Sequence, residues 1–252
     1  MTTPRAIVLV AAVFAVVALA PMLVTRPAAA AEAPLPTVVE LFTSQGCSSC
    51  PPADKFLGEL VERPDLLALS IHVDYWDYIG WKDPFASADN TKRQRDYAAA
   101  LKLRYVYTPQ MVIHGASHAT GSDRSSVLRR IAEAQVLPRL PVTVRHVGGR
   151  IEVNVAGAGN GIDASDEAAV WLAVFDRRHE TAIKRGENGG RTLTYHNVVR
   201  EMVRVGTWRG RPLALASALD DIGRRADGCA VIVQSVKTGR ILGAARVALP
   251  GA

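Results

Sequence analysis

Hydrophobic and polar positions in the first half of the chain alternate between strand-like and helix-like patterns. β-branched and aromatic residues fill residues 37–44, and DKFLGELVE, residues 54–62, then places its apolar side chains at helical spacing. Residues 66–76 form a nearly continuous apolar run, as expected of a strand covered on both faces of a parallel sheet. Residues 91–103 have a composition that favours a helix. The chain is therefore predicted to begin strand, helix, strand, helix.

A proline marks the start of the next predicted strand. The segment YTPQMVIHG places Thr108 and Pro109 directly before a short apolar run, and Gly115 then opens a tight turn into SHATG. A helix capped by serine or aspartate, SDRSSVLRRIAEAQ, follows. Because proline has no amide to pair, it belongs at an edge or a bend of a sheet. The pattern over residues 37–136 thus predicts the order β-α-β-α-β-β-α.

From about residue 140 the pattern changes to the period of two that is typical of strands. VTVRHV and RIEVNVAG flank Gly148 and Gly149, a two-residue turn suited to positive φ, and KTG marks a second hairpin. Further strand-like runs are AAVWLAVFD, TYHNVVREMVRVGTW, CAVIVQSV and RILGAARVAL. Six or seven strands without strong helical periodicity predict a mostly β, sandwich-like domain over residues 140–252.

The first thirty-odd residues have the pattern of an export signal. Arg5 precedes the apolar run AIVLVAAVFAVVALA, and a stretch of small residues ends in PAAAAEA. The apolar run has about fifteen residues, fewer than the roughly twenty of a membrane-spanning helix. We therefore expect a signal peptide at residues 1–31, cleavage near Ala31 and a periplasmic or secreted product without stable membrane insertion. An uncleaved anchor is the alternative.

Composition and charge exclude few functions. The chain has 252 residues and a formal net charge of +6. This basic excess is too mild and too evenly spread to predict nucleic acid or anionic lipid as a partner. An exported protein also enters an oxidising compartment, where disulfides persist, so the cysteines are candidates for chemistry.

The candidate chemistry lies in ELFTSQGCSSCPPAD, where Cys47 and Cys50 are two residues apart at the first strand-to-helix turn. A sulfur near the unpaired amides of a helix start is stabilised as a thiolate. We therefore expect Cys47, exposed to solvent, to attack a partner's disulfide, and Cys50 to resolve the mixed disulfide. Pro51 and Pro52 set the helix start at one of these two residues, so the dipole acts weakly on Cys47. The two serines between the cysteines do not fix the direction of electron flow.

Two resemblances extend this interpretation. The order of elements, the Cys47-x-x-Cys50 turn and Thr108-Pro109 before the third strand resemble the thioredoxin fold. The stretches VVELFTSQGCSSCPPAD, HVDYWDYIGWKDPF, YTPQMVIHG and GENGG resemble a group of secreted bacterial proteins catalogued as a domain of unknown function, number twelve twenty-three. The first resemblance implies an α/β thioredoxin-like domain over residues 37–136, followed by the β-rich domain; the second brings no established activity.

The thioredoxin resemblance also implies roles for single residues. Pro109 is similar in position to the cis-proline that packs against the disulfide and presents its backbone to an extended substrate, so Thr108 beside it is assigned to substrate binding. Glu40 interrupts the first apolar strand. It is either a buried acid of raised pKa that shuttles protons to Cys50, as in some thioredoxin-like proteins, or a half-exposed, ion-paired glutamate.

Aromatic residues gather beyond the second predicted strand. Tyr75 and Trp76 follow its carboxyl end, at the edge of an α/β sheet where ligands tend to bind. They form either a platform for a peptide partner or a packed loop. The later segment GENGG is interpreted as a flexible hairpin loop, with an anion site or a contact to the first half as alternatives.

No metal or other cofactor is assigned. A zinc site formed by the two cysteines with His114 and His118 is excluded by distance, because His114 lies about 17 Å beyond Pro109 at roughly 3.3 Å per strand residue. Cu(I) held by the cysteine pair and His72 stays an alternative.

The third cysteine needs a separate interpretation. Cys229 begins an apolar strand and is expected to be a small buried core residue, with a bridge to Cys47 or to a second chain as the alternative. An inert bridge between Cys47 and Cys50 would close a very small loop, where the entropic gain is least. The sequence therefore predicts an exported thiol-disulfide oxidoreductase that acts on protein or small-molecule thiols. The alternative is a non-catalytic thioredoxin-like binding protein, such as a Cu(I) carrier.

Overall fold

A computed structural model of the chain describes residues 35–159, 161–219 and 225–250. The predicted signal peptide, residues 1–31, lies outside the described residues. None of the described helices is long and apolar enough to cross a lipid bilayer. Residues 34–252 form one compact unit.

The first half contains its elements in the predicted order. They are β1 (Thr37–Thr43), α1 (Pro51–Val61), β2 (Leu66–His72), α2 (Ala88–Ala100), β3 (Gln110–Ile113), β4 (Ser117–Thr120) and α3 (Arg124–Gln135), with a short 3-10 helix, η1 (Asp77–Ile79), before α2. The two prolines do place the start of α1 at Pro51.

The second half contains seven strands, as the period of two predicts. They are β5 (Val142–Val147), β6 (Arg150–Val155), β7 (Ala168–Ala182), β8 (Thr192–Trp208), β9 (Leu213–Ala218), β10 (Gly228–Ser235) and β11 (Ile241–Ala248). Gly148 and Gly149 have φ angles of 56° and 75° and form the tight turn between β5 and β6. The predicted hairpin between β10 and β11 is also present.

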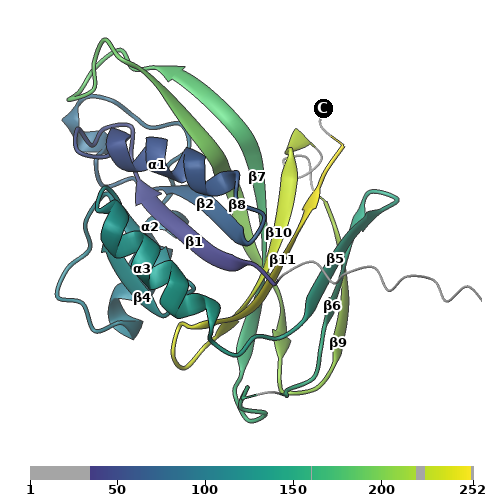
Figure 1. Cartoon of the computed structure of the whole chain (residues 1–252). Helices are drawn as coiled ribbons and strands as arrows, with labels where there is room; N and C mark the ends of the chain where they lie inside the picture. Colours follow the sequence, from purple (N-terminus) through teal and green to yellow (C-terminus); the bar gives the residue numbers. More distant parts are fainter. Residues whose placement is uncertain (1–34, 160, 220–224, 251–252) are drawn as a thin grey trace, which may run out of the picture. The chain divides into compact units, whose positions relative to one another are not determined.

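The predicted fold class, a thioredoxin-like α/β domain followed by a β-sandwich, is wrong. Strands from both halves form a single mixed sheet of eight strands in the order β11-β10-β7-β8-β2-β1-β3-β4. Strand β2 meets β8 in parallel at Ser70 and Val198, so the sheet crosses the predicted domain boundary. Strands β5, β6 and β9 form a second sheet of three strands. Eleven strands against three α-helices make the described structure mostly β (Figure 1).

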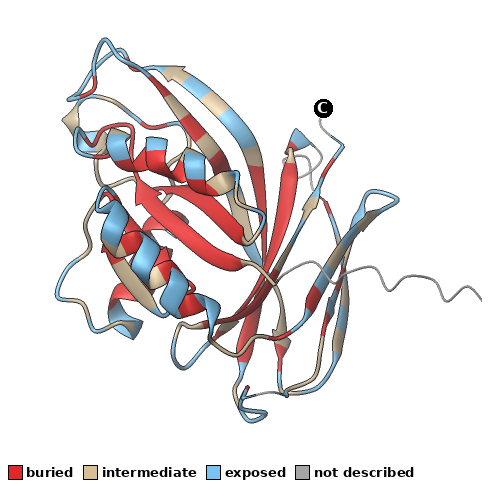
Figure 2. Ribbon diagram, viewed as in Figure 1, coloured by how far each residue is buried: buried red, intermediate tan, exposed pale blue. Residues whose placement is uncertain are grey.

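Helices cover both faces of the sheet where β1 lies (Figure 1). Alternate side chains of a strand point to opposite faces, so Val39 and Leu41 pack against α1 and α3. Val38 and Phe42 turn to the other face and pack against Tyr97 of α2. The strands between these helices are almost wholly buried (Figure 2).

Two core clusters explain why the halves share one structure. Phe175 of β7 and Ile232 of β10 belong to the same cluster as Phe42 of β1. A second cluster packs the three-stranded sheet, through residues such as Ile151, onto Val170 and its neighbours in β7, β10 and β11. Neither half can bury its apolar side chains alone.

We predict that a fragment of residues 35–136 does not fold by itself. Without β7, β8 and β10 it exposes the apolar side chains that pack on Phe175 and Ile232, and it leaves the edge of β2 unpaired. Urea unfolding followed by circular dichroism should show no cooperative transition for the fragment, with residues 35–250 as the control. A two-state transition in the fragment would show that the first half is an independent domain.

Candidate functional site

The two neighbouring cysteines form a disulfide at the start of α1. The sulfur atoms of Cys47 and Cys50 are bonded and the Cα atoms are 5.4 Å apart. Cys50 is the N-cap residue of α1, and its carbonyl oxygen accepts hydrogen bonds from the amides of Ala53 and Asp54 at 2.9 and 3.1 Å. The bond therefore joins the turn after β1 to the first turn of the helix.

The disulfide is covered, and the expectation of an exposed Cys47 is wrong for this oxidised form. Both cysteines have an exposed fraction of 0%, whereas Ser48 and Ser49 between them are exposed. The Ser49 hydroxyl lies 3.3 Å from the Cys47 sulfur. A partner can reach the sulfur only when a neighbouring segment moves.

One covering segment is the loop between β7 and β8, which contains GENGG. The Asn188 amide donates hydrogen bonds to the carbonyl oxygens of Gln45 and Cys47, both at 2.9 Å, and its side chain is fully buried. The Glu187 carboxylate accepts a hydrogen bond from the Ser48 amide at 3.1 Å. The segment is the hairpin loop of β7 and β8, as predicted, and the alternative of a contact to the first half is also confirmed.

The other covering segment lies between β2 and α2. Gln45 donates its amide to Asp83 at 2.8 Å and accepts a hydrogen bond from the Trp81 indole at 2.8 Å. An added Cβ on Gly46 would lie 3.1 Å from atoms of both Trp76 and Ile79, so this segment passes directly over the turn. Side chains from both covering segments thus hold the backbone just before Cys47.

The predicted substrate-binding residues come together only in part. The Trp76 indole donates a hydrogen bond to the Thr108 hydroxyl at 2.8 Å, and the Thr108-Pro109 bond is cis, as predicted. Tyr75 instead donates its hydroxyl to Gln94 of α2, which agrees with the packed-loop alternative. Tyr78, in the aromatic stretch after β2, is 81% exposed, and Tyr105, which the sequence interpretation did not single out, is 72% exposed.

Pro109 lies close to the first turn of α1. An added Cβ on Gly121 would lie 2.9 Å from the Cβ of Ala53 and 3.4 Å from that of Pro109. Gly121 therefore lies next to both Ala53 and Pro109. The Pro109 carbonyl is already engaged, because it accepts the Gly121 amide at 2.9 Å. The structure therefore brings Pro109 toward the disulfide turn, while its role in substrate binding stays a prediction.

Glu40 is fully buried on the face of the sheet that α2 covers. Its Oε1 accepts a hydrogen bond from Arg93 at 2.6 Å, and its Oε2 accepts one from the Tyr97 hydroxyl. Arg93 also donates to Gln234 of β10 at 3.2 Å. Both oxygens of Glu40 are thus occupied; Glu40 links β1 to α2, and Arg93 links α2 to β10.

A different acid lies on the α1 side, and sequence reasoning missed it. Asp54, one turn into α1, is 4% exposed and accepts a hydrogen bond from the Thr43 hydroxyl at 2.8 Å. Burial raises the pKa of Asp54 to about 7, against the attraction of His72. In the sequence, Asp54 could have been noticed as a single acid on the otherwise apolar face of the helix. Its polar neighbours lie on strands that are distant in the sequence.

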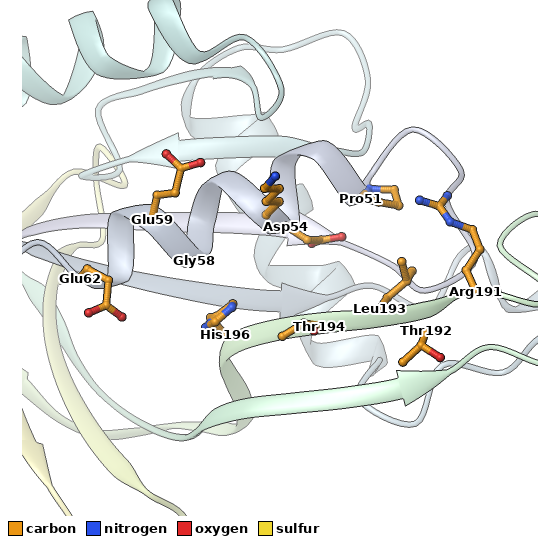
Figure 3. A pocket seen from close by; sticks show the side chains of 11 residues that line it. Pro51, Asp54, Gly58, Glu59, Glu62, Arg191, Thr192, Leu193, Thr194 and His196 are labelled. Carbon is orange, nitrogen blue, oxygen red and sulfur yellow. The ribbon is translucent and has the colours of Figure 1, made fainter.

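A cavity of about 520 Å³ opens between α1 and β8, and its lining includes Pro51, the residue after Cys50 (Figure 3). One wall is formed by residues of α1 and by Glu62 just after it, and the other by Arg191 and residues of β8 up to His196. The Asp54 carboxyl lies between the helix and the strand (Figure 3). Cationic and anionic side chains both border the cavity, so it favours no single charge.

His72, His114 and Cys229, which the sequence analysis considered as metal ligands or a bridge partner, are all buried. His72 contacts Asp83 through Nδ1 at 2.7 Å, and His114 accepts the Val38 amide at 3.3 Å. Burial lowers the pKa of His114 to about 3. Cys229 is buried and unbridged, as predicted, and burial raises its pKa to about 12. Among the described residues, no group of three or more His, Cys, Asp or Glu side chains is placed to hold a metal ion.

A family model described as "Protein of unknown function (DUF1223)" matches residues 38–234. No curated protein matches the chain. A crystal structure of an Agrobacterium tumefaciens protein from a structural genomics consortium is 35% identical, with a TM-score of 0.74 over 85% of this chain and 94% of that one. HBP35 of Porphyromonas gingivalis shares the fold at 12% identity, with a TM-score of 0.58 over 87% and 76% of the two chains.

We predict that Asp54→Asn stabilises the protein increasingly as the pH rises. The folded state holds the Asp54 proton up to about pH 7, whereas an unfolded aspartate loses it near pH 4. The free energy of unfolding of the parent protein therefore falls as the pH rises from about 4 to about 7, by at most on the order of 4 kcal/mol. A neutral amide at this position avoids that loss. Urea unfolding of the oxidised proteins at about pH 5 and pH 8 measures the difference. The exposed Asp89→Asn is the control, and an equal offset at both pH values would contradict the prediction.

Proposed function

The chain belongs to the DUF1223 family, and within that family we propose that it is an exported thiol-disulfide oxidoreductase that works through Cys47 and Cys50. Its partners are protein or small-molecule thiols and disulfides. Export is inferred from the signal-like pattern of residues 1–31, and exported compartments sustain disulfide chemistry.

The observation that supports this proposal most directly is the position of the disulfide. It closes a loop with only two residues between the cysteines, immediately before α1, with Cys50 as the N-cap. Such a small loop removes little entropy from the unfolded chain, so the bond contributes little as a structural staple. The adjacent amides at the helix start favour a thiolate when the bond is opened.

The proposed exchange has two chemical steps. In the reduced protein the Cys47 thiolate attacks a partner disulfide, forming a mixed disulfide and releasing one partner thiolate. Cys50 then attacks the Cys47 sulfur, and the second partner thiolate leaves. Two electrons pass from the protein's thiols to the partner. The reverse sequence oxidises a partner, so the same site serves either direction.

Access to the sulfur atoms depends on the loop between β7 and β8. Asn188 and Glu187 occupy backbone groups of the disulfide turn, at the Cys47 carbonyl and the Ser48 amide. An extended partner that pairs with this turn must displace these contacts. The loop therefore competes with the partner for the same backbone groups.

We predict that Cys47→Ser, in the chain lacking residues 1–31, abolishes the reduction of insulin disulfides in the presence of dithiothreitol. In the same chain, Cys50→Ser should leave partner proteins covalently attached to Cys47. Cys229→Ala is the matched control and should keep full activity, because its thiol is buried and unbridged. Turbidity of reduced insulin and non-reducing gels measure the two effects. Cu(I) binding by the parent protein without any exchange would contradict the proposal.

We predict that Asn188→Ala accelerates opening of the disulfide. The substitution removes two hydrogen bonds that hold the covering loop, each with a net contribution of about 1 kcal/mol, so the rate of reduction by dithiothreitol should rise by roughly thirtyfold. Free thiols counted over time give the rate. The control is Asn154→Ala at an exposed position of β6, and equal rates in all three proteins would show that the loop does not limit access.

A further inference from the structure

Four buried polar atoms on one side of the large sheet have no hydrogen-bond partner among the described residues. They are Asp54 Oδ2, Ser70 Oγ, His72 Nε2 and Tyr195 OH. Each of these residues is at most 4% exposed. Most buried polar atoms in proteins are paired, so four unpaired atoms in one region indicate a function for that region.

The four atoms gather beneath α1. Ser70 and His72 are alternate residues of β2 and therefore share the face of the sheet that α1 covers. Thr43 pairs with His72 across the strands and donates its hydroxyl to Asp54 at 2.8 Å. The rings of His72 and Tyr195 lie 4.8 Å apart, centroid to centroid. Strands β1, β2 and β8 thus enclose Asp54 from the side opposite its helix.

Asp54 is also one helical turn beyond Cys50. The Asp54 amide donates to the Cys50 carbonyl at 3.1 Å, and residues four apart on a helix share a face. Both side chains are buried. Among the other acids of α1, Glu59 is exposed and paired with Arg124, and Glu62 lies at the far end. Asp54 is therefore the acid of this helix closest in sequence to the resolving cysteine.

The charged groups around Asp54 come from every neighbouring element. The titratable groups that face it are His72 on β2, Asp83 before α2 and Tyr195 on β8, and, around the adjoining cavity, Lys55, Glu59, Glu62, Arg191 and His196. Burial is the largest influence and places the pKa of Asp54 at about 7, with His72 opposing it. A group of that pKa exchanges its proton near neutral pH.

We propose that Asp54 takes up the proton of Cys50 when this thiol closes the disulfide, and that Ser70, His72 and Tyr195 hold water that carries the proton. The proposal rests on the exchange function given above. In the step, the S–H bond of Cys50 breaks and its proton goes to Asp54 Oδ2. The Cys50 sulfur bonds to the Cys47 sulfur, and the partner leaves as a thiolate with the electron pair of the broken S–S bond. When the disulfide is reopened, Asp54 returns the proton.

Glu40, the acid that the sequence suggested for this task, lies on the opposite face of the sheet. Its neighbours Val39 and Leu41 face α1, whereas Glu40 meets Arg93 of α2. Both of its carboxylate oxygens are already bonded. Asp54 has one oxygen free and is on the helix that Cys50 begins.

The reaction of the fully reduced protein with dithiobis(nitrobenzoate) separates the two chemical steps. Attack by Cys47 releases the first nitrothiobenzoate, and attack by Cys50 on the mixed disulfide releases the second. In the parent protein the rate of the second phase should increase as the pH rises, with a midpoint near pH 7. In Asp54→Asn the second phase should slow by on the order of 10²-fold at pH 7 and lose this midpoint, because an amide cannot accept the proton. The first phase should be unchanged.

Two further variants complete the test. Tyr195→Phe removes a hydroxyl that can stabilise the ionised carboxylate, so the midpoint of the second phase should shift to higher pH; an unshifted midpoint overturns the proposal even where Asp54→Asn fails to fold. Asp89→Asn, an exposed acid on α2, should change neither phase. If Asp54→Asn matches the parent in the rate and pH profile of the second phase, Asp54 is not the acceptor. A missing first phase would instead refute the exchange function itself.

Discussion

A carboxylate inside the large sheet can stay buried only with a cation beside it, and the pair formed by Glu40 and Arg93 determines how the layers meet. An isolated charge in the interior is strongly unfavourable, so Arg93 must lie directly over β1. The same guanidinium reaches Gln234 of β10, which places α2 across the junction of the two halves of the chain. The opposite face of β1 is then left to α1 and α3, and the disulfide turn is on that side.

The candidate site is assembled from segments that are far apart in the sequence. Gln45, just before the disulfide, is held by Asp83 from the segment after β2 and by Asn188 from the loop after β7. Asp83 also contacts His72, which belongs to the polar group beneath α1. The contacts that cover the sulfur atoms and the groups that surround the buried acid are therefore joined through one aspartate.

Local structure could be predicted from the sequence, whereas the assembly of the strands could not. Element order, the start of α1 at Pro51 and the turn at Gly148 follow from short-range patterns. The sandwich prediction failed because AAVWLAVF and CAVIV are continuous apolar runs, typical of strands covered on both faces and not of alternating sandwich strands. Asp54 was missed for a related reason: its environment is formed by Thr43, His72 and Tyr195, which only the tertiary fold brings together.

The paired strands β7 and β8 extend beyond the end of their neighbour β10. β10 pairs with β7 only as far as Phe175, where a bulge interrupts the register, and the two strands continue alone to the loop at Asn188. A two-stranded ribbon is weakly stable and bends more readily than a wide sheet. The outer half of the ribbon is thus held to the disulfide turn by side-chain contacts, such as those of Asn188 with Gln45 and Cys47, and not by a third strand paired beside β7.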